Sequence, residues 1–378
     1  MRAALRSFGI EPAGAIPGAN GGFALYQGRR HTLPTGFASL VTTGLLGLPA
    51  KFEFAKLLST IGSIDPAAVQ RESWSSWLDA NIRHAIVRDL LRMLVRIATF
   101  TNDPDRQSAG AALEQLQLAA RGNVLYVNGG WQTMVDALRE AAIARGVQIR
   151  TAAPVVAIDA HSSRVATAIR LADGSFVPAS AVIVTGGPTD VDAIVGTRFA
   201  ATLSPPVRLA TLDIALTSLP QPRRTVAFGV DAPTYFSVHS AVATLAPTGG
   251  ALLHVSRYLR PDETAGRDVE RALEQIVDDM QPGWRDAIAV KQFLPSLTVT
   301  HAEVTADRAG TAGRPSPRLP QFDNVFVAGD WIGSRGQLSD AAAASAVEAA
   351  EAALKGCAAD AAAEAAAVAQ PLRAARVS

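Results

Sequence analysis

The sequence is poor in the residues that build disulfides, metal sites and common hydrolase motifs. It has one cysteine, Cys357, which excludes an internal disulfide and a zinc site made of cysteine thiolates. Its six histidines show no H-x-x-x-H or H-E-x-x-H spacing, so we expect no bound metal. Neither a G-x-S-x-G elbow nor a P-loop is present, which argues against a serine hydrolase and against a P-loop nucleotidase.

The chain also lacks a charge excess and a long apolar run. Lys and Arg number 35 and Asp and Glu 34, a net charge of +1, and aromatic residues make up only 6%. Without a basic patch interleaved with aromatic residues, we expect no nucleic-acid partner. The longest apolar stretch, 36–50, contains Pro49 and three hydroxyl side chains and falls short of the roughly 20 residues that a membrane span needs. We therefore expect a cytoplasmic protein.

What the sequence does have is apolar content and helical periodicity. Hydrophobic residues make up 48% and charged residues 18% of the 378 residues, a composition typical of a core-rich globular chain. At roughly 150 residues per domain, this length predicts two domains or slightly more. Between 51 and 120, Arg88, Arg92 and Arg96 recur at helix spacing. We interpret this stripe as a solvated helix face, with peripheral contact to anionic membrane lipid as the alternative.

The order of the expected elements indicates an α/β chain with an inserted second domain. After the helical region, the pattern predicts a strand, a Gly129-Gly130 break, a helix and several short strands, at 123–128, 131–145, 147–150, 154–158, 165–171, 176–177 and 181–185. Antiparallel strands covered by one helix are expected next, at 207–216, 225–230, 235–239, 251–258 and 267–280. A buried strand at 324–328 and an alanine-rich helix at 337–354 follow.

The C-terminal strand, turn and helix form the strongest motif, with the sequence NVFVAGDWIGSRGQLSDAAAASAVEAAEAAL over 324–354. Gly329 permits close approach of the backbone, and Asp330 places a carboxylate where α/β folds bind ligands, at the carboxyl end of a strand. A glycine-bearing loop leads into the helix, whose first amides have no intrahelical partner and favour an electronegative ligand group. A strand and helix that merely pack together are the alternative interpretation.

This stretch resembles the C-terminal flavin-contacting motif of the FAD-dependent amine oxidase, phytoene desaturase and protoporphyrinogen oxidase family. The resemblance implies that Asp330, after Gly329, contacts the ribitol of FAD. It also implies that the amides of Leu338 and Ser339 face O2 of the flavin, and that Gly329 and Gln337 belong to the same cofactor-binding site.

A second stretch, YVNGGWQTMVDALREAAIARGVQIRTAAPVVAI over 126–158, resembles another segment of the same family. The resemblance implies that the backbone of Val155 pairs with the adenine of FAD. The following VIVTGGP, over 182–188, resembles the strand end that passes near the FAD diphosphate, which implies that Thr185 and Gly186 bind the cofactor.

Two features depart from the family pattern. No two glycines are separated by a single residue, so the G-x-G-x-x-G unit that binds pyrophosphate in this family is absent. Amine oxidases of the family commonly place a lysine near flavin N5, but no lysine lies between Lys56 and Lys291. Lys291 is a candidate only if its strand reaches the flavin, and we interpret it as a surface residue. This absence favours the desaturase-like branch.

The resemblance therefore implies a fold class and a domain order. We expect an α/β, Rossmann-like FAD/NAD(P)-binding domain, incomplete at its N-terminus, with an interleaved α+β substrate domain. The FAD domain is assigned 1–50 (a remnant of its edge), 123–196 and 301–356, the substrate domain 51–122 and 197–300, and a low-complexity tail 357–378.

The implied function is that of an FAD-dependent oxidoreductase of desaturase or dehydrogenase type. Hydride from a C–H bond of a small hydrophobic, isoprenoid-like substrate would pass to flavin, and no catalytic residue is assigned. The alternative is a truncated, non-catalytic remnant of the flavoprotein fold or a partner subunit.

Overall fold

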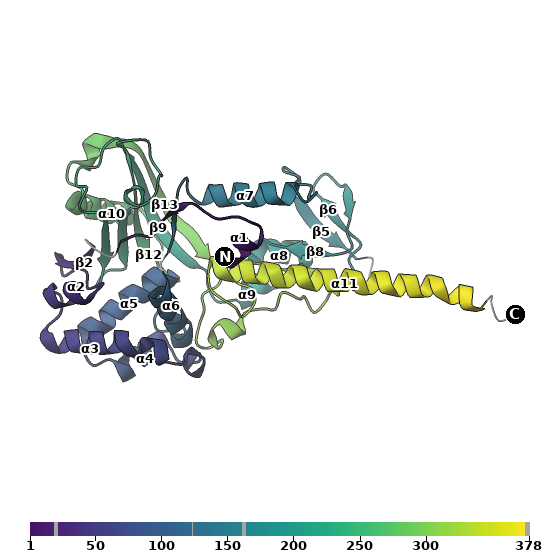
Figure 1. The fold of residues 1–378 in the computed structure, drawn as a ribbon, viewed down its shortest axis with the longest axis horizontal. Helices are drawn as coiled ribbons and strands as arrows, with labels where there is room; N and C mark the ends of the chain where they lie inside the picture. Colours follow the sequence, from purple (N-terminus) through teal and green to yellow (C-terminus); the bar gives the residue numbers. More distant parts are fainter. Residues whose placement is uncertain (19–21, 123, 161–163, 375–378) are drawn as a thin grey trace. The chain divides into compact units, whose positions relative to one another are not determined.

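The computed structural model describes residues 1–18, 22–122, 124–160 and 164–374, with side chains up to residue 357. The chain folds as two compact units (Figure 1). Unit 1 comprises Met1, Gln148–Ser204 and Thr311–Ser378, and unit 2 comprises Arg2–Val147 and Pro205–Gly310. The segments 1–50 and 123–147, which the sequence assigned to the FAD domain, thus lie in unit 2 apart from Met1, because their strands pair there. Among the described residues, no helix is long and apolar enough to cross a membrane.

Unit 2 is built on a seven-stranded sheet in the order β13-β9-β12-β11-β10-β2-β3. All neighbours are antiparallel except β10 and β2, which run parallel. The strands are β2 (Phe23–Tyr26), β3 (Arg29–Thr32), β9 (Val207–Leu216), β10 (Val226–Gly229), β11 (Thr234–Val238), β12 (Ala251–Tyr258) and β13 (Ile288–Thr300). The strands and the helix expected between 207 and 280 are therefore confirmed, whereas β13 was not predicted.

One face of this sheet packs against helix α10 (Arg267–Met280). Acidic side chains in the first turn of α10 suit the positive end of its dipole. Its apolar residues recur every three or four positions and meet the inward-facing residues of β9 and β12, forming a core that includes Leu212, Ile214, Leu253, Val255, Val269, Leu273, Val277 and Met280. The intervening residues of β9 and β12 point to the opposite face of the sheet.

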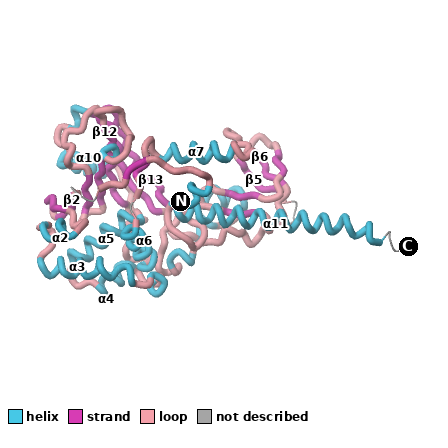
Figure 2. Tube along the Cα trace, in the orientation of Figure 1, coloured by secondary structure: helices cyan, strands magenta, loops and turns pink. Residues whose placement is uncertain are grey.

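A second core of unit 2 lies among the helices that follow β3 (Figure 2). These are α2 (Phe37–Thr42), α3 (Leu48–Thr60), α4 (Trp74–Asn81), α5 (Ala85–Thr99) and α6 (Ala109–Arg121), with the 3-10 helices η1 (Ile61–Ser63) and η2 (Pro66–Val69). Unit 2 also contains α1 (Arg2–Ser7), α7 (Trp131–Ile143) and the short antiparallel pair β1 (Gly14–Ala15) and β4 (Tyr126–Val127). The 3-10 helices η3 (His239–Ala241) and η4 (Trp284–Ala287) follow β11 and α10.

The arginine stripe of α5 is not a solvated face, which corrects the interpretation made from sequence. Arg96 donates to the carbonyl oxygens of Gly229 and Val230 at 3.0 and 3.1 Å, so it joins α5 to the end of β10. Arg88 donates to the Ile82 carbonyl oxygen at 2.7 Å, and Arg92 pairs with Asp89 at 3.0 Å. The periodicity identified the helix correctly, but it could not show which face the sheet would cover.

Unit 1 contains two small sheets. The antiparallel one has the order β5-β6-β7, with β5 (Val155–Asp159), β6 (Ala168–Leu171) and β7 (Phe176–Pro178), and the parallel pair consists of β8 (Val182–Val184) and β14 (Val325–Val327). Its helices are α8 (Pro188–Val195), α9 (Phe199–Thr202) and α11 (Ser339–Ala374). The strand predicted at 147–150 is wrong, because Val147 bonds back to the carbonyl oxygen of Ala142 in the turn that ends α7.

Candidate functional site

Within unit 1, the parallel pair brings two of the predicted cofactor-binding segments to one edge. β14 pairs with β8 in the register Val325↔Val182 to Val327↔Val184, and the Ala328 amide donates to the Val184 carbonyl oxygen at 3.0 Å. Because parallel strands end at the same edge, Gly329 and Asp330 leave the sheet beside Thr185 and Gly186. This edge is where an α/β fold places its ligand.

Gly329 is fixed between the strand and α11. Its amide donates to Ser345 Oγ at 3.0 Å, and its carbonyl oxygen lies 2.9 Å from the same hydroxyl. A Cβ at Gly329 would lie 2.8 Å from Nε1 of Trp331, so a larger residue would displace that ring. Trp331 is fully buried with its ring edge against Phe199, and its Nε1 has no hydrogen-bond acceptor among the described residues.

The start of α11 presents backbone amides that the described part of the chain does not satisfy. Gly336 and Leu338 have φ values of +71° and +54°, so the chain turns through the left-handed region just before the helix. The amides of Asp340 and Ala342 bond back to the carbonyl oxygens of Gln337 and Leu338 at 3.1 Å. No acceptor for the amides of Leu338 and Ser339 occurs among the described residues. Two donors therefore remain at the positive end of the helix dipole.

These features fit the flavin and ribitol end of FAD. Unpartnered amides suit the acceptor atoms along the edge of a flavin. The space beside the Cα of Gly329 is occupied by the Trp331 ring, so this glycine serves the packing of that ring. The Gly186-Gly187 turn does not replace the missing glycine-rich unit, since the Gly187 amide donates to Asp190 Oδ2 at 3.1 Å and caps α8. The residues thus fit one end of the cofactor, and the sequence offers no G-x-G-x-x-G cradle for its pyrophosphate.

Seven of the eight predicted residues belong to the β8–β14 edge or to the start of α11. The eighth, Val155, begins β5, where it pairs with Leu171. That sheet packs against α8, the helix that follows Gly187, so Val155 belongs to the same unit but to a different sheet. The cofactor-binding roles of all eight residues stay predictions.

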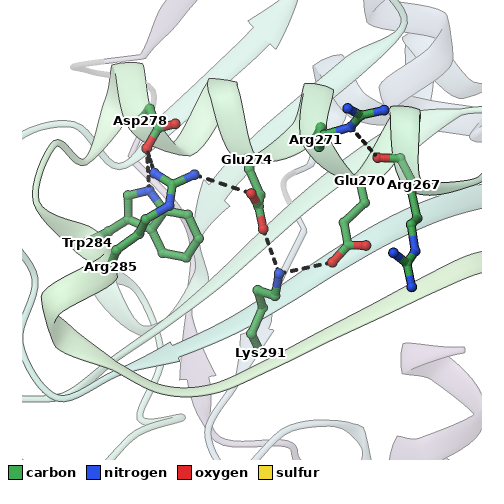
Figure 3. A network of polar contacts seen from close by, with 8 residues as sticks. All are labelled: Arg267, Glu270, Arg271, Glu274, Asp278, Trp284, Arg285 and Lys291. Carbon is green, nitrogen blue, oxygen red and sulfur yellow. Dashed lines mark hydrogen bonds and ion pairs between the residues drawn. The ribbon is translucent and has the colours of Figure 1, made fainter.

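Lys291 is engaged in a polar network on the α10 side of unit 2 (Figure 3). Its Nζ lies 3.0 Å from Glu270 and 2.6 Å from Glu274, and these carboxylates raise the pKa of the lysine. Arg285 continues the network by pairing with Glu274 and Asp278. With its ammonium held by two carboxylates of α10, Lys291 has a structural role in unit 2, and we assign it none in catalysis.

A polar cluster in unit 2 was missed by sequence reasoning. It consists of Tyr126, Asp213, Tyr235, His239 and His254, which come from β4, β9, β11, η3 and β12. Nδ1 of His254 lies 2.5 Å from Oδ1 of Asp213, and the two tyrosine hydroxyl groups lie 3.1 Å apart. No local motif could have revealed it, because strand pairing brings together residues up to 128 positions apart.

Comparisons with known proteins agree on the fold. An oxidoreductase from Methanosarcina mazei has a TM-score of 0.64 at 18% identity, covering 92% of this chain and 84% of that one. A single-substitution variant of putrescine oxidase has a TM-score of 0.68 at 14% identity, covering 93% and 85%. Cyclohexylamine oxidase from Brevibacterium oxydans has a TM-score of 0.60 at 15% identity, covering 93% and 84%. At these identities the likeness establishes the fold, a mixed α/β architecture with a Rossmann-like FAD domain.

A search of curated proteins finds no match. The family model for flavin-containing amine oxidoreductases matches residues 1–354, most of the chain. This match confirms the resemblance seen in the sequence, and with it FAD as the cofactor. The chain therefore belongs to the flavin-containing amine oxidoreductases and is an FAD-dependent oxidoreductase.

Proposed function

We propose that this protein oxidises a C–H bond of a small hydrophobic substrate in the manner of a desaturase or dehydrogenase. FAD, when bound, supplies the acceptor for the hydride. The observation that carries the proposal is the unpartnered pair of amides at the start of α11, next to the edge where Asp330 leaves β14. In this proposal, Leu338 and Ser339 donate to the acceptor edge of the cofactor, and Asp330 contacts its ribitol.

The engagement of Lys291 supports the desaturase-like branch. It is the one lysine between residues 57 and 354, and two carboxylates of α10 hold its ammonium group. The chain thus offers no lysine in that range to assist the oxidation of an amine. A reaction that depends on positioning a C–H bond, and not on a lysine, fits these residues better.

Reconstitution with FAD followed by anaerobic titration tests the proposal. We expect the purified chain to bind FAD, seen as visible flavin absorption that remains after desalting. Isoprenoid hydrocarbons should then bleach this absorption, whereas primary alkylamines should not. Bleaching by amines alone would contradict the substrate class, and protein that stays colourless with added FAD would contradict the whole proposal.

An apolar surface on α2 and α3 supports a hydrophobic substrate that comes from a membrane. Phe37, Leu48 and Phe52 are 86%, 71% and 75% exposed, and Val41 is exposed beside them. Lys51 joins the two helices by donating to the Val41 carbonyl oxygen at 2.6 Å. We propose that this surface contacts the membrane, because soluble surfaces rarely expose aromatic side chains so fully in one place.

Vesicle flotation tests this contact. The double variant Phe37→Ser, Phe52→Ser should lose most of its binding to anionic phospholipid vesicles, while Leu118→Ser, at an exposed apolar position on α6, should bind like the wild type. Equal flotation of all three proteins would contradict the proposal.

A further inference from the structure

Unit 1 contains a cavity near the amino end of β14. Its volume is about 460 Å³, which is in the range of small-molecule sites in proteins. Its walls come from the chain between Arg318 and Phe326 and from Arg164, all of which belong to unit 1. Gly329 and Asp330 follow the carboxyl end of β14, so the cavity and the predicted cofactor edge lie at different ends of this strand.

Hydrogen bonds hold the backbone segments around this cavity in place. The buried amide group of Asn324 donates to the carbonyl oxygens of Ala166 and Ser180, each at 2.8 Å, and accepts from the Ala166 amide at 2.8 Å. On the edge of β14 that faces away from β8, the Val327 amide donates to the Pro317 carbonyl oxygen at 2.8 Å. The chain on both sides of the cavity is therefore tied to β14, and the cavity is formed before a ligand binds.

Arg318 places an unpaired positive charge in the cavity. Its Cζ lies 5.4 Å from the centroid of the Phe326 ring, and among the described residues its guanidinium group has no hydrogen-bond acceptor and no carboxylate partner. An arginine side chain stays charged in proteins, and its N–H groups can only donate. The group that binds beside it should therefore carry negative charge and accept hydrogen bonds.

The second arginine of the cavity is paired with a carboxylate. Nε and Nη2 of Arg164 donate to Oδ1 of Asp323 at 3.1 and 2.9 Å, and the Asp323 amide donates to the Arg164 carbonyl oxygen at 2.9 Å. Two arginines and one aspartate line the cavity, which leaves one net positive charge. This charge matches a ligand with one negative charge.

The rest of the cavity lining is apolar. It consists of Leu319, Pro320, Phe322 and Phe326, of which Leu319 and Phe326 are buried in the core of unit 1. Such surfaces are stabilised when a hydrocarbon group displaces water from them. The cavity thus combines one unpaired guanidinium group with an apolar wall.

We propose that this cavity binds a small organic monocarboxylate, with its carboxylate on Arg318 and its hydrocarbon part on Leu319 and Phe322. The planar guanidinium group presents parallel N–H donors that match the two oxygens of a carboxylate. An alcohol would leave the charge of Arg318 unbalanced, and inorganic phosphate would leave the apolar wall uncovered. The site goes beyond the proposed function, and binding at it does not require FAD.

Isothermal titration calorimetry of the full chain tests the inference with hexanoate as the probe. Hexanoate should give a saturable isotherm. Hexan-1-ol, which lacks the charge, and inorganic phosphate, which lacks the hydrocarbon part, should each bind roughly 10-fold more weakly or less tightly still. Absence of saturable hexanoate binding, or equal affinity for either of the other two probes, would overturn the inference.

Removal of the unpaired charge tests the role of Arg318. Arg318→Gln should weaken hexanoate binding about 10-fold, as expected for the loss of a hydrogen bond to a charged group. Arg198→Gln is the matched control, because Arg198 is also an exposed arginine of unit 1 but does not line the cavity. It should bind hexanoate like the wild type. If Arg318→Gln binds hexanoate as tightly as this control, the inference is wrong.

Asp323→Asn provides a test in the opposite direction. It keeps an oxygen that accepts from Arg164 but removes the one negative charge of the cavity lining. Hexanoate should then bind roughly 3-fold more tightly, in line with the strength of an exposed charge pair. Damage to the fold cannot imitate a gain of affinity. Unchanged or weaker hexanoate binding by Asp323→Asn would also overturn the inference.

Discussion

At the scale of single residues, Glu303 has a buried carboxyl group that lies near the carboxyl group of Asp103. Its side chain is 3% exposed, and neither carboxyl oxygen has a hydrogen-bond donor among the described residues. Burial, and then the neighbouring Asp103, raise the pKa of Glu303 to about 8, although Arg106 acts in the opposite direction. Glu303 therefore keeps its proton at neutral pH in the folded state.

This raised pKa predicts a loss of stability with rising pH. Between the unfolded pKa of about 4.5 and the folded pKa of about 8, the unfolded state releases a proton that the folded state retains. The free energy of unfolding should then fall as pH rises, by up to about 1.4 kcal/mol per pH unit from this group. Glu303→Gln removes this dependence, so its Tm relative to the wild type should increase from pH 5 to pH 8. Parallel Tm curves across that range would contradict the prediction.

At the scale of secondary structure, the sequence predicted some helices and strands better than others. The best predicted are those whose apolar residues all lie on the face that packs against another element. The helix expected at 267–280 and the strands at 207–216 and 251–258 have the bounds observed, because each buries one face against another element. β13 was missed since most of its residues are exposed and its pairing with β9 is irregular, so no alternation marks it. Arg96 of α5 shows the same limit, because its bonds to the end of β10 depend on tertiary packing.

The turn into α11 leads to a prediction about a single backbone position. A Cβ at Gly336 would lie 2.9 Å from the Cβ of Asp340, and its φ of +71° disfavours any other residue. Gly336→Ala should displace the first turn of α11 and weaken FAD binding by about 10-fold or more, in line with a strain of roughly 1–3 kcal/mol.

Gly356→Ala in the same helix is the control for that measurement. Gly356 has open space around its Cα, so an added methyl group should leave FAD affinity unchanged. Both affinities can be measured by the quenching of FAD fluorescence. Equal affinities in the two variants would show that the start of α11 does not touch the cofactor.

At the scale of the whole molecule, the chain crosses between two units that differ in the length of their paired strands. Unit 2 contains two large apolar clusters, around α5 and α10. In unit 1, the cluster formed by Phe326, Ala328, Ala349 and Ala352 has one large side chain, and the parallel strands β8 and β14 have three residues each. The sequence predicts that two domains interleave, and this domain assignment stays a prediction. The pairing of β2 with β10, which joins the start of the chain to the sheet of unit 2, has no local signal in the sequence.

This difference predicts where cofactor binding will stabilise the protein. A ligand that binds only the folded state shifts the unfolding equilibrium of the segments that hold it, and short strand pairs open most readily. Saturating FAD should therefore slow amide hydrogen exchange in β8 and β14 and at the start of α11, while β9 and β12 exchange as slowly without FAD as with it. Mass spectrometry of peptic fragments resolves these segments. The matched ligand is ADP-ribose, which shares the ADP part of FAD but has no flavin ring. Protection by ADP-ribose equal to that by FAD at the start of α11 would place the flavin elsewhere, because the amides of Leu338 and Ser339 are expected to contact the ring system and not the nucleotide.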